Sequence, residues 1–79
     1  MAISPGAIFR ACDPQRYFFE LAPQDPMTEF CYQVISVHRF TMAIVQIKRH
    51  ASGRIETNAR EIGRAAFTDE VRLGALVRT

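Results

Sequence analysis

The segment 42–61 constrains the fold more than any other part of the chain, because its pattern is that of two β-strands joined by a tight turn. Its first half, Met42–Arg49, is rich in β-branched residues, and polar residues enter only toward its end. Residues 50–53 have a turn-like composition, and Gly53 is free to adopt a positive φ. The second half, 54–61, alternates in polarity, so the segment predicts an antiparallel β-hairpin.

The alternation in the second strand also predicts which side chains face the core. Ile55, Thr57 and Ala59 are expected on a buried face. The opposite face is expected to be solvated, and it carries Arg54, Glu56, Asn58 and Arg60. One buried and one wet face are typical of a strand in an antiparallel sheet.

The N-terminal third predicts a second pair of strands, with one alternative. Ile8–Cys12 and Arg16–Leu21 flank Asp13-Pro14, which suits the first positions of a type I turn. The same two residues suit the capped start of a short helix. The aromatic run 17–19 favours the strand. At least one of its three rings must lie on the opposite face of that strand, where either the helix or a loop covers it or it forms a partner-facing surface.

A helix is predicted over 26–38, directly after Asp25-Pro26. Apolar residues and one histidine recur there at spacings of three and four, namely Met27, Phe30, Cys31, Val34 and His38. The composition of 30–37 favours a strand instead.

The C-terminal segment 69–78 has two interpretations. Apolar and other residues alternate from Val71 to Arg78, which predicts a strand. The alternative is a helix capped by Thr68, which Gly74 would weaken by about 1 kcal/mol. With the strand preferred, the elements are expected in the order β-β-α-β-β-β.

The chain is therefore expected to be a single two-layer α+β domain spanning 1–79, an antiparallel β-sheet packed by one helix. Its 79 residues suffice for one small core, and a hydrophobic fraction of 48% with a net charge of +2 excludes a disordered chain. No apolar run approaches the roughly 18–20 residues of a membrane span, and no secretory signal begins the chain. A cytoplasmic protein is expected.

The chemistry-bearing side chains do not form a recognisable catalytic or metal-binding pattern. Cys12, Cys31, His38 and His50 lack the close pairing of structural zinc ligands. The two cysteines are expected to be ordinary buried thiols rather than a disulfide. No nucleophile–base–orienter set and no glycine-rich phosphate loop stands out, so a protein without enzymatic activity and without a cofactor is expected.

Positive charge concentrates in the second half of the chain. Residues 41–79 hold seven cations against four carboxylates, whereas residues 1–40 hold three against four. The predicted binding patch consists of Lys48, Arg49, Arg54, Arg60 and Arg64. Such a patch favours phosphate or an acidic protein surface, and the alternative is a solvated surface neutralised by Glu56 and Glu61. No aromatic residue interleaves the patch, so nucleic acid would be contacted through its backbone alone.

The Met42–Glu61 hairpin and the cations Lys48, Arg49, Arg54 and Arg60, in a small chain without a catalytic set, resemble in type the anti-CRISPR proteins of phages and mobile elements. The resemblance implies a type I inhibitor that docks on a crRNA-guided surveillance complex in a bacterial host. It further implies that target DNA is blocked or that the complex is held on the wrong DNA. Many such inhibitors are acidic DNA mimics, and the positive balance here departs from that pattern.

Two functions are therefore carried forward. The first is a binding protein that inhibits a protein or ribonucleoprotein complex. The second is a small basic regulator whose patch contacts the phosphates of nucleic acid, with little sequence preference. Neither function predicts a membrane contact, and the sequence leaves the oligomeric state open.

Overall fold

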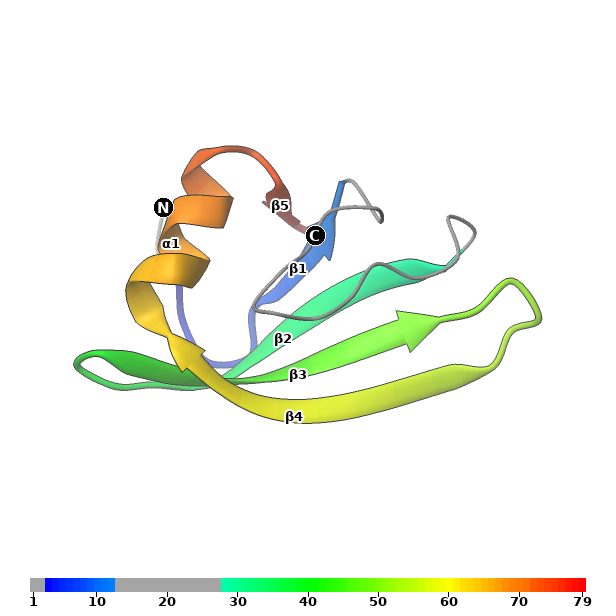
Figure 1. The fold of residues 1–79 in the computed structure, drawn as a ribbon, viewed down its shortest axis with the longest axis horizontal. Helices are drawn as coiled ribbons and strands as arrows, with labels where there is room; N and C mark the ends of the chain where they lie inside the picture. Colours follow the sequence, from blue (N-terminus) through cyan, green and yellow to red (C-terminus); the bar gives the residue numbers. More distant parts are fainter. Residues whose placement is uncertain (1–2, 13–27) are drawn as a thin grey trace.

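The computed structural model describes residues 3–12 and 28–79, which form a five-stranded antiparallel sheet with a helix packed on one face (Figure 1). The elements are β1 (Ile8–Ala11), β2 (Glu29–Val37), β3 (Thr41–Arg49), β4 (Ile55–Gly63), α1 (Arg64–Arg72) and β5 (Leu76–Arg78). Across the sheet the order is β4-β3-β2-β1-β5, so the last strand lies beside the first. The predicted α+β class, an antiparallel sheet covered by one helix, is confirmed.

The predicted central hairpin is confirmed. β3 and β4 pair without interruption from Thr41 opposite Gly63 to Arg49 opposite Ile55. In the connecting turn, the Gly53 N–H donates to the carbonyl oxygen of His50 at 2.9 Å, and Gly53 has a φ of 91°. A residue with a Cβ adopts such a φ only with strain, so glycine fixes the geometry of this turn.

The helix predicted over 26–38 is wrong, because residues 29–37 form the central strand β2. The alternating residues Phe30, Tyr32 and Val34 are all buried on the same face. Helical and strand spacing both place Phe30 and Val34 together, so the apolar pattern alone did not separate the two structures. Pairing with β3 along one edge and with β1 along the other stabilises this segment as a strand.

The C-terminal segment contains both of the structures that were considered for it. The strand predicted over much of 69–78 is reduced to the three residues of β5, and α1 begins earlier, at Arg64. Gly74, with a φ of 77°, lies in the turn between α1 and β5. Thr68 does not cap the helix but lies inside it, where its hydroxyl donates to the Arg64 carbonyl oxygen at 3.0 Å. Among the described residues the order is therefore β-β-β-β-α-β.

The first of the two N-terminal strands is confirmed as β1, which pairs with both β2 and β5. The proposed second strand, Arg16–Leu21, and the turn or cap at Asp13-Pro14 lie outside the described residues. The burial of the aromatic run 17–19 lies outside them as well.

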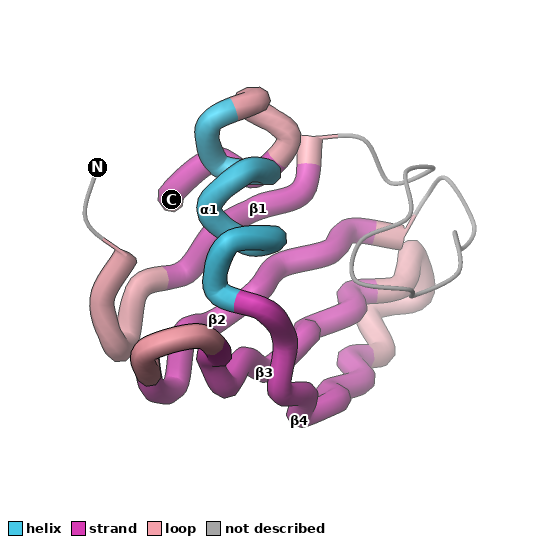
Figure 2. Tube along the Cα trace, turned by 60° about the vertical axis from the view of Figure 1, so that its left-hand side comes forward, coloured by secondary structure: helices cyan, strands magenta, loops and turns pink. Residues whose placement is uncertain are grey.

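The core lies between α1 and the sheet face that the helix covers (Figure 2). Phe67 is the buried side chain of α1, and its ring meets that of Phe9 edge to face at 5.2 Å. The other core residues are Ala7, which precedes β1, and, from the strands, Phe9, Ala11, Phe30, Tyr32, Val34, Met42, Ile44, Ile62 and Leu76. A polar pair lies among them, since the Gln46 side-chain amide donates to the Tyr32 hydroxyl at 3.2 Å. Burial raises the pKa of Tyr32, so this hydroxyl keeps its proton at neutral pH.

Candidate binding surfaces

One face of the sheet, called here the open face, has no described element packed on it. It is the face opposite α1 (Figure 2). Its exposed apolar side chains, with exposed fractions of 36–56%, are Ile8, Ile35, Ile55 and Val77. Ile35 lies at the irregularity in β2, where the register shifts between Val34 and Ser36, and it lines a shallow hollow with Ala43 and Val45. Exposed apolar side chains gathered on one face are typical of an interaction surface.

The structure reverses the predicted faces of β4. Arg60 lies opposite Ile44 and Ile62 lies opposite Met42, so the even-numbered residues share the helix-covered face. Ile55, Thr57 and Ala59, which were predicted to be buried, lie on the open face and are exposed. The alternation was read correctly, but the sequence did not reveal that the polar side of this strand faces α1.

Three of the five predicted patch residues gather at the β3–β4 turn. Lys48 and Arg49 end β3, and Arg54 directly precedes β4. They divide between the two faces, because Lys48 lies opposite Glu56 on the helix-covered face and Arg49 lies opposite Ile55 on the open face. The turn therefore carries cations on both sides rather than one cationic surface.

Glu56 neutralises part of this charge. Its Oε1 lies 3.1 Å from Nη2 of Arg54, and its Oε2 lies 3.3 Å from Nε2 of His50. The hydrogen bond with His50 and the charge of Arg54 lower the pKa of Glu56, so the carboxylate remains ionised in neutral solution. Lys48 and Arg49 make no ion pair with any described residue.

The other two predicted patch residues lie away from the turn. Arg60 is half-buried in the middle of β4, and Arg64 begins α1 beyond the far end of that strand. At the rise of an extended strand, Arg54 and Arg64 are separated by about 30 Å. The five cations predicted to form one patch are therefore spread along the full length of β4.

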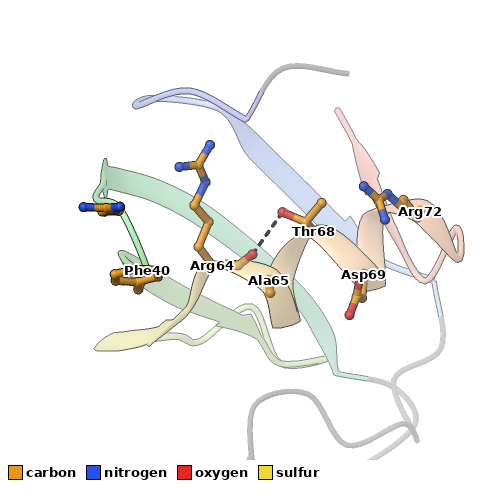
Figure 3. A pocket seen from close by; sticks show the side chains of 7 residues that line it. Phe40, Arg64, Ala65, Thr68, Asp69 and Arg72 are labelled. Atoms are coloured by element: carbon orange, nitrogen blue, oxygen red, sulfur yellow. Dashed lines mark hydrogen bonds between the residues drawn. The ribbon is translucent and has the colours of Figure 1, made fainter.

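Arg64 instead belongs to a second cationic site that the sequence did not predict. It lines a shallow hollow of about 290 Å³ together with Arg39, Phe40, Ala65, Thr68, Asp69 and Arg72. Figure 3 shows Arg64, Thr68 and Arg72 following one another along α1, with Phe40 at the Arg64 end. The Arg39 guanidinium stacks on the Phe40 ring, 5.2 Å from its centroid. We call this site the arginine hollow.

The local structure explains why the arginine hollow forms. Arg64 is tied to the β2–β3 turn, because its backbone N–H donates to the carbonyl oxygen of Phe40 at 3.0 Å. Arg64, Thr68 and Arg72 are spaced by four residues, which places them on one side of a helix. The spacing of four residues is present in the sequence. It predicts a shared side only if 64–72 is a helix, and the helix was predicted at 26–38 instead.

The remaining chemistry-bearing side chains are dispersed. Among residues 3–12 and 28–79, no group of three His, Cys, Asp or Glu side chains is arranged to hold a metal ion. Ser36 Oγ lies 3.0 Å from His38 Nε2 at the exposed end of β2, and no described residue holds the other ring nitrogen. Both cysteines are free. Cys12 is exposed, contrary to the expectation of a buried thiol, and burial raises the pKa of Cys31.

The described part of the chain also has no helix with the length and apolar character that crossing a membrane requires. Comparisons of the whole chain with protein-family models, with curated proteins and with solved structures gave no match.

Proposed function

We propose that this chain is a binding protein without enzymatic activity, an inhibitor of the anti-CRISPR kind that docks on a crRNA-guided surveillance complex. Docking would block or misdirect the binding of target DNA by that complex. The observation that supports docking is the open face, where exposed apolar side chains occur on four of the five strands. Isoleucine side chains that stay exposed to water contribute little to the stability of the domain. A partner that covers them would gain binding free energy from their burial.

Two arginines suit the open face to a protein surface. Arg10 lies opposite Cys31 on β1, and Arg49 lies opposite Ile55 near the turn. Arginine is enriched at protein interfaces, because its planar guanidinium binds carboxylates in a bidentate manner and stacks on apolar groups. Apolar side chains interspersed with arginines therefore fit a partner surface that carries both apolar and acidic groups.

The arginine hollow supports a second candidate function, the direct binding of nucleic-acid phosphates. Arg39, Arg64 and Arg72 line this hollow, and Asp69 is the one carboxylate among the lining residues. Guanidinium groups bind phosphate in the same bidentate manner as carboxylate. Lys48 and Arg49, which make no ion pair with any described residue, would add non-specific contacts.

Affinity capture from a lysate of bacteria that carry a type I CRISPR–Cas system, with and without nuclease, separates the two candidates. The inhibitor proposal predicts that Cas subunits are recovered after nuclease treatment and are retained between about 50 and 200 mM salt. Phosphate binding predicts that the captured proteins are lost with nuclease. It also predicts an affinity for DNA that falls steeply over that salt range, in proportion to the number of phosphates contacted.

Matched variants assign the surface that is used. Ile35→Glu and Val77→Glu place a carboxylate on the open face, and Leu73→Glu makes the same kind of change at a residue that is 70% exposed at the end of α1. The inhibitor proposal predicts that the first two variants lose the Cas complex and that Leu73→Glu retains it. Equal recovery with all three variants would contradict docking through the open face.

A further inference from the structure

The strand β4 forms one edge of the sheet and is unusually regular for an edge. It is nine residues long, contains no proline, and pairs with β3 without a register shift (Figure 1). The other edge is formed by β5, which has three residues. A long edge strand without a bulge presents a row of unpaired N–H and C=O groups, and natural proteins commonly interrupt or shorten such edges. No strand among the described residues pairs with the outer side of β4, so this edge is able to pair with another strand.

The pairing with β3 determines which backbone groups face outward. The His50 N–H donates to the Arg54 carbonyl oxygen at 2.9 Å, so this pair is hydrogen-bonded. Hydrogen-bonded and non-hydrogen-bonded pairs alternate along an antiparallel ladder. The backbone groups of Glu56, Asn58 and Arg60 therefore point toward β3. The free edge carries those of the odd-numbered residues, Ile55, Thr57, Ala59 and Glu61.

A second copy of the chain is the occupant that the charges of β4 favour. In a sheet continued across a two-fold axis, residues that face each other lie on the same side of the sheet. The axis can therefore pass through any one residue of β4. With the axis at Thr57, Arg60 faces Arg54 of the second copy, and with the axis at Arg60 that residue faces itself. Both alignments oppose like charges, which destabilises a strand pair.

Only one alignment near the centre of β4 brings opposite charges together. With the axis at Asn58, Glu56 of each copy lies opposite Arg60 of the other, so the same attraction occurs twice. With the axis at Ala59, Glu56 faces Ile62 of the second copy and the charges are unmatched. In the alignment at Asn58, the outward backbone groups of Thr57 face those of Ala59, which completes the hydrogen-bonded pairs.

We propose that two copies of this chain associate through their β4 strands, antiparallel about a two-fold axis at Asn58, with reciprocal Glu56–Arg60 ion pairs. These residues form a non-hydrogen-bonded pair, in which cross-strand side chains approach most closely. The Arg60 side chain makes no hydrogen bond or ion pair with any described residue. The Glu56 side chain is 39% exposed beside Arg54 and His50, and a carboxylate has room for further hydrogen bonds.

Pairing would create a ten-stranded sheet from the two five-stranded sheets, with both open faces on the same side. The helices would both lie on the opposite side. The proposal does not depend on the identity of a partner protein, because it uses the edge of the sheet rather than either face.

The first test is the mass of the full chain in solution, measured by light scattering or sedimentation over a range of concentrations. A dimer has twice the monomer mass of 9.0 kDa. Arg60→Glu and Glu56→Arg each place like charges in both pairs, and each is expected to weaken dimerisation about tenfold. The double variant Glu56→Arg/Arg60→Glu restores opposite charges and is expected to recover dimerisation. Arg78→Glu, at the other edge, is the control for a change in net charge.

The second test fixes the register independently of charge. In a chain carrying Cys12→Ser and Cys31→Ser, Asn58→Cys places two thiols opposite each other at the axis. The Cα separation of such a pair is about 4.5 Å, within the range that a disulfide spans. Thr57→Cys would face Ala59 of the second copy and is expected not to cross-link under mild oxidation.

Several results would overturn the proposal. A wild-type chain that remains monomeric at every concentration would do so. A dimer that is indifferent to the charge reversals, or that cross-links through Thr57→Cys in preference to Asn58→Cys, would also do so. If β4 instead pairs only with an extended segment of a different protein, the mass measured in the first test would be that of a monomer.

Discussion

The ring of Phe67 in α1 meets the ring of Phe9 in β1 edge to face, with centroids 5.2 Å apart and planes at 84°. Both side chains are fully buried. α1 has nine residues and no side-chain cap at its first turn, so packing rather than intrinsic helix stability holds it in place. This contact joins the helix to the strand that lies beside the C-terminal strand β5.

Phe67→Ala is expected to lower the free energy of unfolding by about 3–5 kcal/mol, because it leaves a cavity between α1 and the sheet. Such a loss approaches the entire stability of a small domain, so Phe67→Leu, with an expected loss of about 1 kcal/mol, gives a measurable second point. Urea unfolding followed by circular dichroism measures both. Phe40→Ala, at a side chain that is 75% exposed, is the control and should change the stability little.

Gly53→Ala is expected to destabilise the central hairpin by about 1–2 kcal/mol, because the φ of 91° is unfavourable for a residue with a Cβ. Gly63→Ala is the matched control. Gly63 has a φ of −67°, and an added Cβ would lie at an ordinary 3.9 Å from that of Ala66. Thermal unfolding of the two variants should therefore separate them. Equal losses would show that the turn does not require a positive φ.

His50→Ala is expected to raise the pKa of Glu56 toward its ordinary value of 4.5, because the hydrogen bond with His50 is the main cause of the lowered value. An NMR titration of the glutamate carboxyl carbons measures the change. In the wild type, the folded pKa lies below the unfolded one. The stabilisation is therefore complete above pH 4.5 and is lost as the pH falls through the folded value. If the Glu56 titration were the same in both chains, the His50 contact would be absent in solution.

Cys12 is expected to react with a thiol reagent before Cys31 does. Cys12 is exposed, whereas burial raises the pKa of Cys31 and lowers the fraction of reactive thiolate. The rates measured separately in Cys31→Ser and Cys12→Ser chains at pH 8 give the comparison. Because Cys31 lies on the open face between Arg10 and Ile47, a docked partner should slow its reaction further. The opposite order of reactivity would contradict the burial of Cys31.

The sequence predicted the hairpin of β3 and β4, which has a local turn signal in Gly53 and two strands that pair with each other. β2 was missed although β3, one of its two partners, follows it after only three residues, because Phe30 and Val34 fit helical and strand spacing equally. Because β2 was predicted to be the helix, the position of α1 at 64–72 was not predicted.

The candidate site was predicted only in part, because much of it depends on the packing of α1. Lys48, Arg49 and Arg54 meet at the turn because the hairpin alone brings them there. Arg39, Arg64 and Arg72 line one hollow only because α1 packs beside the β2–β3 turn. The orientation of β4 depends on which face the helix covers, and a perfect alternation of residues does not contain that information.

Docking through the open face is tested most directly by target-DNA binding of a purified type I surveillance complex in the presence of this chain. The proposed function predicts that the wild-type chain and Leu73→Glu reduce DNA binding, or change the DNA that is bound, at a stoichiometric ratio. It predicts that Ile35→Glu has little effect at the same concentration. Unchanged DNA binding with the wild-type chain, or equal inhibition by Ile35→Glu, would contradict it.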